Sequence, residues 1–149
     1  MEGAGGSSGF QVDPDGMGQG VTMEEIILPD TEVLVDFFTG HAKGVAFVNT
    51  HAFRIILSSI IVAELFAGVK GRDEQTALED FVSLFHVAPV TAEIARAAGL
   101  YKRDYGASHG VGLADAVIAA TALSEKASLK TLNIRHYPII KGLKPAYTK

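Results

Sequence analysis

The sequence contains no cysteine, so disulfide bonds and thiolate metal sites are excluded, and a reducing compartment is compatible with it. No apolar run approaches the ~20 residues that are needed to span a bilayer. The formal net charge of −4 argues against a protein that coats nucleic acid by bulk electrostatics. With 48% hydrophobic and 20% charged residues, the composition is that of a globular protein. We therefore expect a cytoplasmic protein that does not enter a membrane.

Residues 1–22 lack what a folded core needs. They hold seven of the sixteen glycines and include a Gly-Ser-Ser-Gly run, and they have neither the basic start nor the apolar centre of a signal peptide. We interpret 1–22 as a disordered expression tag and linker. A single domain is predicted at 23–149, with Met23 as the natural start.

Beyond Met23, short extended runs alternate with amphipathic helices. This alternation predicts an α/β fold, with a doubly wound, mostly parallel sheet and helices on both faces. Extended runs lead into Asp30 and lie at 53–57, 85–90 and 128–132, and helices are predicted from residue 33 and over 42–49, 60–69, 73–84, 91–105 and 113–126.

The first of these units contains the first candidate functional residue. Three apolar residues and a proline lead into Asp30, and a helical pattern follows at once through Val33 and Leu34. A buried strand that ends on a carboxylate and turns into a helix opens many α/β domains. Ligands of such open sheets bind outside the carboxyl ends of the strands, where Asp30 is expected.

Glu64 is the second candidate, because it is the only charged residue between Arg54 and Lys70. Its helix is apolar on nearly every side, so we expect a buried carboxylate, which needs a partner or a metal ion. A capping box is excluded because Glu64 lies five residues after Ser59 rather than three. A structural salt bridge with a distant Lys or Arg stays open.

Asp115 and Asn133 are the remaining candidates. Asp115 follows a glycine-containing loop and could be a helix N-cap, but Leu113 already fits the helical stripe, which would place Asp115 inside the first turn. Asn133 follows the last predicted strand, where an asparagine is also a common turn former.

The three acids together indicate a metal site more strongly than any one of them does. Asp30, Glu64 and Asp115 can converge on one crevice of an open sheet, where each pair of carboxylates would repel by about 3 kcal/mol at ~5 Å and an effective dielectric constant of ~20. A hard dication removes that repulsion, and oxygen ligands suit Mg²⁺ or Mn²⁺. Ions held in this way commonly serve phosphodiester hydrolysis.

Four segments of the sequence resemble the signature segments of PIN-domain ribonucleases, with most similarity to the VapC-like toxins of toxin–antitoxin pairs. The resemblance covers residues 25–147 in the expected order and spacing. The segments are Asp30-Thr-Glu-Val-Leu-Val-Asp36, Ile60-Ile-Val-Ala-Glu64-Leu, Leu113-Ala-Asp-Ala-Val-Ile-Ala-Ala-Thr-Ala122 and Thr131-Leu-Asn-Ile-Arg-His-Tyr137.

The resemblance implies a single PIN-like domain with about five parallel strands, Mg²⁺- or Mn²⁺-dependent endoribonuclease activity, a homodimer, and inhibition by a small cognate antitoxin protein. It assigns Asp30, Glu64 and Asp115 as catalytic acids and metal ligands, and Thr31 and Asn133 as supporting polar residues. Many relatives carry Asp where this chain has Asn133, so one negative charge is missing and the number of metal ions stays open.

Two other functions remain open from the sequence. A Mg²⁺-dependent phosphatase that forms an aspartyl-phosphate also begins with a strand-end Asp, but it usually has a second Asp two residues later, where this chain has Glu32. A catalytically inactive, partner-binding module of the same fold is the other alternative, which the neutral Asn133 favours and the three acids oppose.

The end of the chain is basic and contains no acid. This segment is either a solvated rim or a surface that contacts phosphates or an acidic partner. A phosphate contact is also conceivable for His136. The basic residues are Lys126, Lys130, Arg135, Lys141, Lys144 and Lys149.

Overall fold

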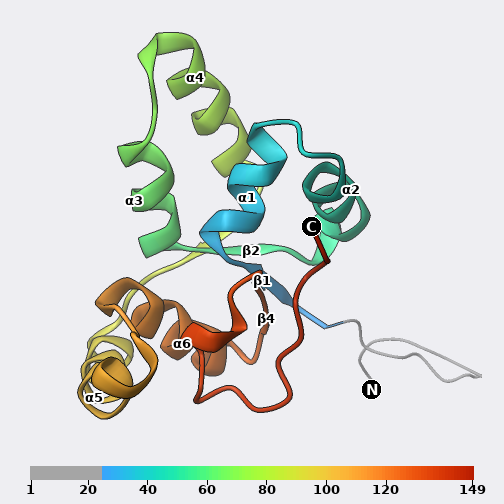
Figure 1. Cartoon of the computed structure of the whole chain (residues 1–149). Helices are drawn as coiled ribbons and strands as arrows, with labels where there is room; N and C mark the ends of the chain where they lie inside the picture. The colour runs from blue at the N-terminus through green and yellow to red at the C-terminus, as the bar shows by residue number, and fades with distance from the viewer. Residues whose placement is uncertain (1–24) are drawn as a thin grey trace, which may run out of the picture.

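The computed structural model describes residues 25–149, so the tag and linker expected at 1–22 lie outside the described residues (Figure 1). Strands and helices alternate as expected. The strands are β1 (Ile27–Pro29), β2 (Ile56–Ser58), β3 (His86–Ala88) and β4 (Ser128–Lys130); the helices are α1 (Thr31–Phe38), α2 (Ala42–His51), α3 (Ser59–Ala67), α4 (Gly71–Val82), α5 (Ala92–His109) and α6 (Leu113–Glu125); and the 3₁₀ turns are η1 (Ala52–Arg54) and η2 (Ile134–His136).

All strand pairs in residues 25–149 are parallel. β1 pairs with β4 and β2 pairs with β3, and a parallel bridge between Ile27 and Ile55 links the two pairs in the order β3-β2-β1-β4. The described part thus has four strands where about five were expected. The C-terminal segment reaches the free side of β4 through one bridge only, between Thr131 and Pro145. Proline has no N–H to donate to a longer ladder.

The strand order reverses at β1. The chain passes from β1 outward through β2 and β3, and then returns to the other side of β1 with β4. The carboxyl ends of β1 and β4 therefore meet at a topological switch point, where ligands bind in open α/β sheets. Asp30 directly follows β1 and Thr131 directly follows β4.

Helices cover both faces of this sheet, which confirms the predicted α/β class. In Figure 1, α1 and α2 lie above the strands, and α5 and α6 lie below them. Ile27 and Leu28 of β1 are fully buried, as strands covered on both faces must be. The alanines of α6 let this helix approach closely, and residues 116–122 are all buried. No helix of residues 25–149 is long and apolar enough to cross a membrane.

Most element positions match the sequence prediction, with one clear difference. Thr91 is the N-cap of α5, as expected, and its hydroxyl accepts a hydrogen bond from the Ile94 N–H at 3.1 Å. The strand predicted at 53–57 starts later, because Phe53 lies in η1 and is fully exposed. High β-propensity describes a side chain that packs on a sheet, and Phe53 has no sheet surface to cover.

The C-terminal segment is anchored on α1 through Asp36. This carboxylate is 6% exposed and accepts hydrogen bonds from the Tyr147 hydroxyl at 2.7 Å and the Lys149 ammonium at 3.1 Å. Burial acts to raise the pKa of Asp36, but the hydrogen bonds from Tyr147 and Lys149 outweigh it and leave the pKa below its usual value. α2 packs closely here, since a Cβ on Gly44 would lie 2.5 Å from the Asp36 Cβ.

Candidate active site

Asp30 is held firmly at the end of β1. It is the N-cap of α1 and 8% exposed, and its Oδ1 accepts a hydrogen bond from the Thr31 N–H at 2.7 Å. Its Oδ2 accepts from the hydroxyls of Thr131 at 2.8 Å and Tyr137 at 2.9 Å. An ionised carboxylate offers about four acceptor positions. Three of them are therefore used inside the protein.

Asp115 approaches Asp30 from α6, although the two residues lie far apart in the sequence. The N-cap of α6 is Gly112, so Asp115 lies in the first turn, as predicted, and the N-cap alternative is wrong. Its Oδ1 lies 3.3 Å from the Tyr137 hydroxyl, and its Oδ2 lies 3.2 Å from Nδ1 of His136. The structure thus brings Asp30 and Asp115 to one shared hydroxyl.

Tyr137 is the residue that joins these two acids. Its side chain is 1% exposed. Burial, followed by the negative charges of Asp30 and Asp115, raises the pKa of the Tyr137 hydroxyl far above its usual value. The hydroxyl therefore stays protonated, and its single hydrogen is shared between the two carboxylates.

Glu64 lies near these acids but differs from the expectation. We expected a buried carboxylate, and this was wrong, because Glu64 is exposed. Only Ile61 and Leu65 of α3 are buried, so the other side of this apolar helix faces outward. Glu64 accepts a 2.5 Å hydrogen bond from the Thr31 hydroxyl and makes no ion pair with a Lys or Arg of residues 25–149.

The two supporting residues complete one hydrogen-bonded network. Thr31 joins both acids, because its N–H donates to Asp30 and its hydroxyl donates to Glu64. Asn133 is exposed, donates its N–H to the Thr131 hydroxyl at 3.0 Å, and places Nδ2 3.1 Å from Nδ1 of His136. That nitrogen, when protonated, donates to Asp115, and when unprotonated, accepts from the Asn133 amide. All five predicted site residues are therefore linked.

The donor atoms suit a hard dication, although they do not form a ready-made cage. Asp30, Glu64 and Asp115 offer carboxylate oxygens, the ligands that Mg²⁺ and Mn²⁺ prefer. Within residues 25–149 no group of three or more His, Asp or Glu side chains is close enough to hold an ion. The Tyr137 hydroxyl contacts both Asp30 and Asp115, and the Thr31 hydroxyl donates a hydrogen bond to Glu64.

Tyr137 and Thr131 were not predicted as site residues, although the hydroxyls of both donate hydrogen bonds to Asp30. Tyr137 lies in the last signature segment, but from the sequence alone a tyrosine at this position cannot be distinguished from an aromatic residue of the core. The available signal was positional, because Thr131 directly follows β4 at the switch point.

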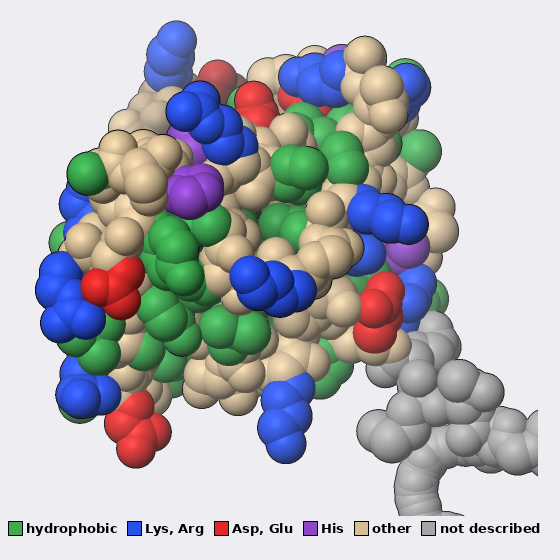
Figure 2. Space-filling view, turned by 60° about the horizontal axis from the view of Figure 1, so that its bottom comes forward, with side chains coloured by type: hydrophobic (Ala, Val, Ile, Leu, Met, Phe, Trp, Pro, Cys, Tyr) green, Lys and Arg blue, Asp and Glu red, His purple; other side chains and the backbone are tan. Residues whose placement is uncertain are grey.

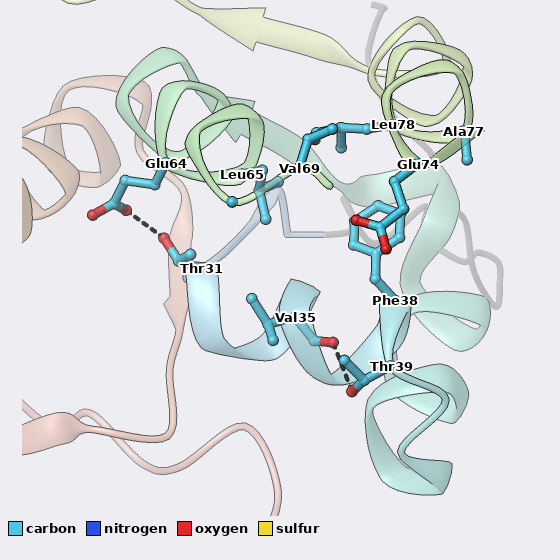
Figure 3. Close-up of a pocket in the computed structure, with 11 residues that line it drawn as sticks. Thr31, Val35, Phe38, Thr39, Glu64, Leu65, Val69, Glu74, Ala77 and Leu78 are labelled. Carbon is cyan, nitrogen blue, oxygen red and sulfur yellow. Dashed lines mark hydrogen bonds between the residues drawn. The ribbon is translucent and has the colours of Figure 1, made fainter. Parts of the chain in front are cut away.

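A cleft of about 350 Å³ extends from this network between α1, α3 and α4. Figure 3 shows Glu64 and Thr31 at one end of the cleft and Glu74 at the other end. Apolar side chains form the walls between these polar ends, among them Val35, Phe38, Leu65, Val69 and Leu78. The cleft therefore offers an apolar groove with a carboxylate at each end.

Two basic residues of the C-terminal segment lie close to carboxylates of the fold. Figure 2 shows Lys and Arg side chains scattered among apolar and neutral surface on the face that carries this segment. Lys149 pairs with Asp36 at 3.1 Å, and Lys130 lies 3.8 Å from Glu25, so both support the fold. Arg135, Lys141 and Lys144 are exposed.

Comparisons with known proteins agree with this architecture. The PIN domain model matches residues 27–139. Ribonuclease VapC19 of Mycobacterium tuberculosis is 38% identical over 124 residues, covering 80% of this chain and 98% of the relative. Ribonuclease VapC10 of the same organism is 34% identical over 129 residues, covering 82% and 93%.

Solved structures agree as well. VapBC2 from Rickettsia felis, bound to a promoter DNA fragment, matches with a TM-score of 0.65 and 27% identity over 79% of this chain and 95% of that chain. A toxin–antitoxin complex from Klebsiella pneumoniae shares the fold, with a TM-score of 0.70 and 24% identity over 81% and 98%. With its switch-point acids and these relatives, the chain belongs to the PIN domain family, in the group that includes the VapC ribonucleases.

Proposed function

We propose that this protein is a Mg²⁺- or Mn²⁺-dependent endoribonuclease and the toxin of a toxin–antitoxin pair, acting on RNA in the cytoplasm. The observation that carries the proposal is the approach of Asp30 and Asp115 to one hydroxyl, with Glu64 tied to the same network through Thr31. The relatives named as ribonucleases support the substrate class.

In this proposal Asp30, Glu64 and Asp115 would hold the metal ion. A divalent cation bound there supplies an activated water molecule and neutralises the charge that develops on the phosphodiester. Thr31 orients Asp30 and Glu64 through its two hydrogen bonds. Asn133, with its neutral amide, contacts His136 rather than adding a fourth negative charge.

The RNA backbone would approach from the side of η2. Arg135 is exposed there, next to the half-buried His136 and the exposed Asn133. A guanidinium group can bind a phosphate oxygen pair through parallel hydrogen bonds. Arg135 and His136 are therefore the proposed phosphate contacts.

The antitoxin would occupy the cleft between α1, α3 and α4. Its apolar side chains would cover Val35, Leu65 and Val69, and a basic side chain would reach Glu64 at the end of the cleft. Such an ion pair would compete with the metal ion for the same carboxylate. The VapBC complexes among the structural relatives support a partner of this kind.

A homodimer is also part of the proposal. Leu113 is 61% exposed and Ile134 is 40% exposed, and both lie within three residues of the proposed active-site residues Asp115 and Asn133. We infer the homodimer from the family resemblance, and a second copy of the chain would cover these two side chains.

Incubation of the purified protein with an RNA pool in Mn²⁺ tests the proposed activity. We expect cleavage by wild type and loss of cleavage in Asp115→Ala, while Leu123→Ala on the exposed side of α6 keeps wild-type activity. Equal cleavage by wild type and Asp115→Ala would overturn the site. Absence of cleavage with any RNA, together with intact antitoxin binding, would favour the inactive partner-binding module.

A further inference from the structure

Tyr137 stands out because its hydroxyl serves the acids from inside the protein. The side chain is 1% exposed, whereas the Asp115 side chain is 27% exposed. The hydroxyl lies 2.9 Å from Asp30 Oδ2 and 3.3 Å from Asp115 Oδ1. The hydroxyl therefore contacts both carboxylates from the core, and the solvent side of Asp115 stays accessible.

We propose that Tyr137 is a positioning residue that holds Asp30 and Asp115 in the arrangement that receives the metal ion. Two carboxylates that approach each other without a cation repel, and a shared hydrogen between them offsets part of this repulsion. The inference rests on the proposed metal-dependent function, and it assigns to Tyr137 a role in metal affinity rather than in the chemical step.

The contacts explain why a phenol suits this position. A hydrogen-bond donor behind a metal ligand fixes the orientation of that ligand, and loss of such a partner commonly weakens metal binding about 10- to 100-fold. Thr131 gives Asp30 Oδ2 a second donor at 2.8 Å, but within residues 25–149 its hydroxyl makes no hydrogen bond to Asp115. Within residues 25–149, the Tyr137 hydroxyl is thus the group that hydrogen-bonds to both acids.

The chain contains a matched control for this role. Tyr147 also donates its hydroxyl hydrogen to a buried aspartate, with 2.7 Å between its oxygen and Asp36 Oδ2, but that pair belongs to the C-terminal anchor. Tyr137→Phe and Tyr147→Phe therefore each remove one oxygen atom and one tyrosine–aspartate hydrogen bond. Only Tyr137→Phe removes it from the proposed metal site.

Mn²⁺ binding to the full-length protein, measured by the loss of the free-ion EPR signal, distinguishes the two roles. We expect both variants to melt below wild type in EDTA. Tyr137→Phe should raise the Mn²⁺ dissociation constant about ten-fold or more, while Tyr147→Phe keeps the wild-type value. If Tyr137→Phe is destabilised but binds Mn²⁺ with wild-type affinity, the positioning role is overturned, while the proposed metal site still stands. Absence of Mn²⁺ binding by wild type would overturn the proposed metal site together with it.

A second measurement uses the unaltered protein in case Tyr137→Phe does not fold. The chain has four tyrosines, so tyrosine labelled with ¹³C at Cζ gives a spectrum that Tyr101→Phe, Tyr105→Phe and Tyr147→Phe assign by elimination. Saturating Mg²⁺ should shift the Tyr137 signal and leave the Tyr147 signal in place. A Tyr137 signal that Mg²⁺ leaves unchanged would contradict the inference.

Discussion

Asp30→Asn should destabilise the metal-free protein, although it is the obvious variant for removing the metal site. Asp30 accepts three hydrogen bonds, one on Oδ1 from the Thr31 N–H and two on Oδ2 from Thr131 and Tyr137. An asparagine has one acceptor oxygen, so its amide nitrogen must face either the Thr31 N–H or the two hydroxyls. An unsatisfied buried donor costs about 1–3 kcal/mol. For a chain of this length, the melting temperature should fall by roughly 2–10 °C.

Glu64→Gln is the contrasting variant. Glu64 is exposed, and a glutamine keeps a carbonyl oxygen that can accept from the Thr31 hydroxyl. Its melting temperature in EDTA should lie close to that of wild type, with a change in unfolding free energy within about 0.5 kcal/mol. Thermal melts of the three proteins in EDTA, followed by circular dichroism, decide the matter. If Asp30→Asn had the same melting temperature as Glu64→Gln, the three hydrogen bonds to Asp30 described above would be refuted.

Three further predictions follow from the same contacts. Mn²⁺ at a hundredfold excess over its dissociation constant should stabilise wild type by about 2.7 kcal/mol, and Asp115→Ala should lose most of this gain; a melt with equal shifts in both proteins would contradict the site. The pKa of Asp36 is lowered in the folded protein. The ionised Asp36 side chain therefore contributes its full stabilisation above about pH 4, where an unfolded aspartate is ionised. This stabilisation is lost as the pH falls through the pKa that Asp36 has in the folded protein. Urea unfolding should thus show the advantage of wild type over Asp36→Asn shrinking below pH 4, and a constant difference would refute the anchor. Val35→Arg in the cleft should weaken antitoxin co-purification by ten-fold or more, whereas Leu123→Arg, which is similarly exposed (48% against 42%), should not; equal retention by both would exclude the cleft as the docking site.

The sequence was sufficient for the fold because its local signals agree with one another. Apolar runs mark buried strands, Thr91 caps its helix, and the small residues of α6 allow close packing. The sequence also placed Asp30 at the strand end and Asp115 in the first helical turn, since both depend on local pattern. The roles of Asp30, Glu64 and Asp115 as metal ligands stay predictions.

The misplaced features depend on contacts between distant segments. An apolar helix normally indicates burial on all sides, but α3 turns one side to the cleft, so Glu64 is exposed. Phe53 has a strand former's side chain and no neighbouring surface to pack on. Tyr137 meets Asp30 and Asp115 only through the tertiary fold, and nothing in its local sequence distinguishes it from a core aromatic residue.

The metal dependence of RNA cleavage is the most direct test of the proposed metal-dependent ribonuclease activity. The initial rate of cleavage of one RNA substrate is measured for wild type and Glu64→Gln, from EDTA through increasing Mn²⁺ concentration. We predict no cleavage in EDTA, a rate that saturates with Mn²⁺ for wild type, and a higher Mn²⁺ requirement or no cleavage for Glu64→Gln. Undiminished cleavage by wild type in EDTA, or identical Mn²⁺ curves for the two proteins, would contradict this prediction.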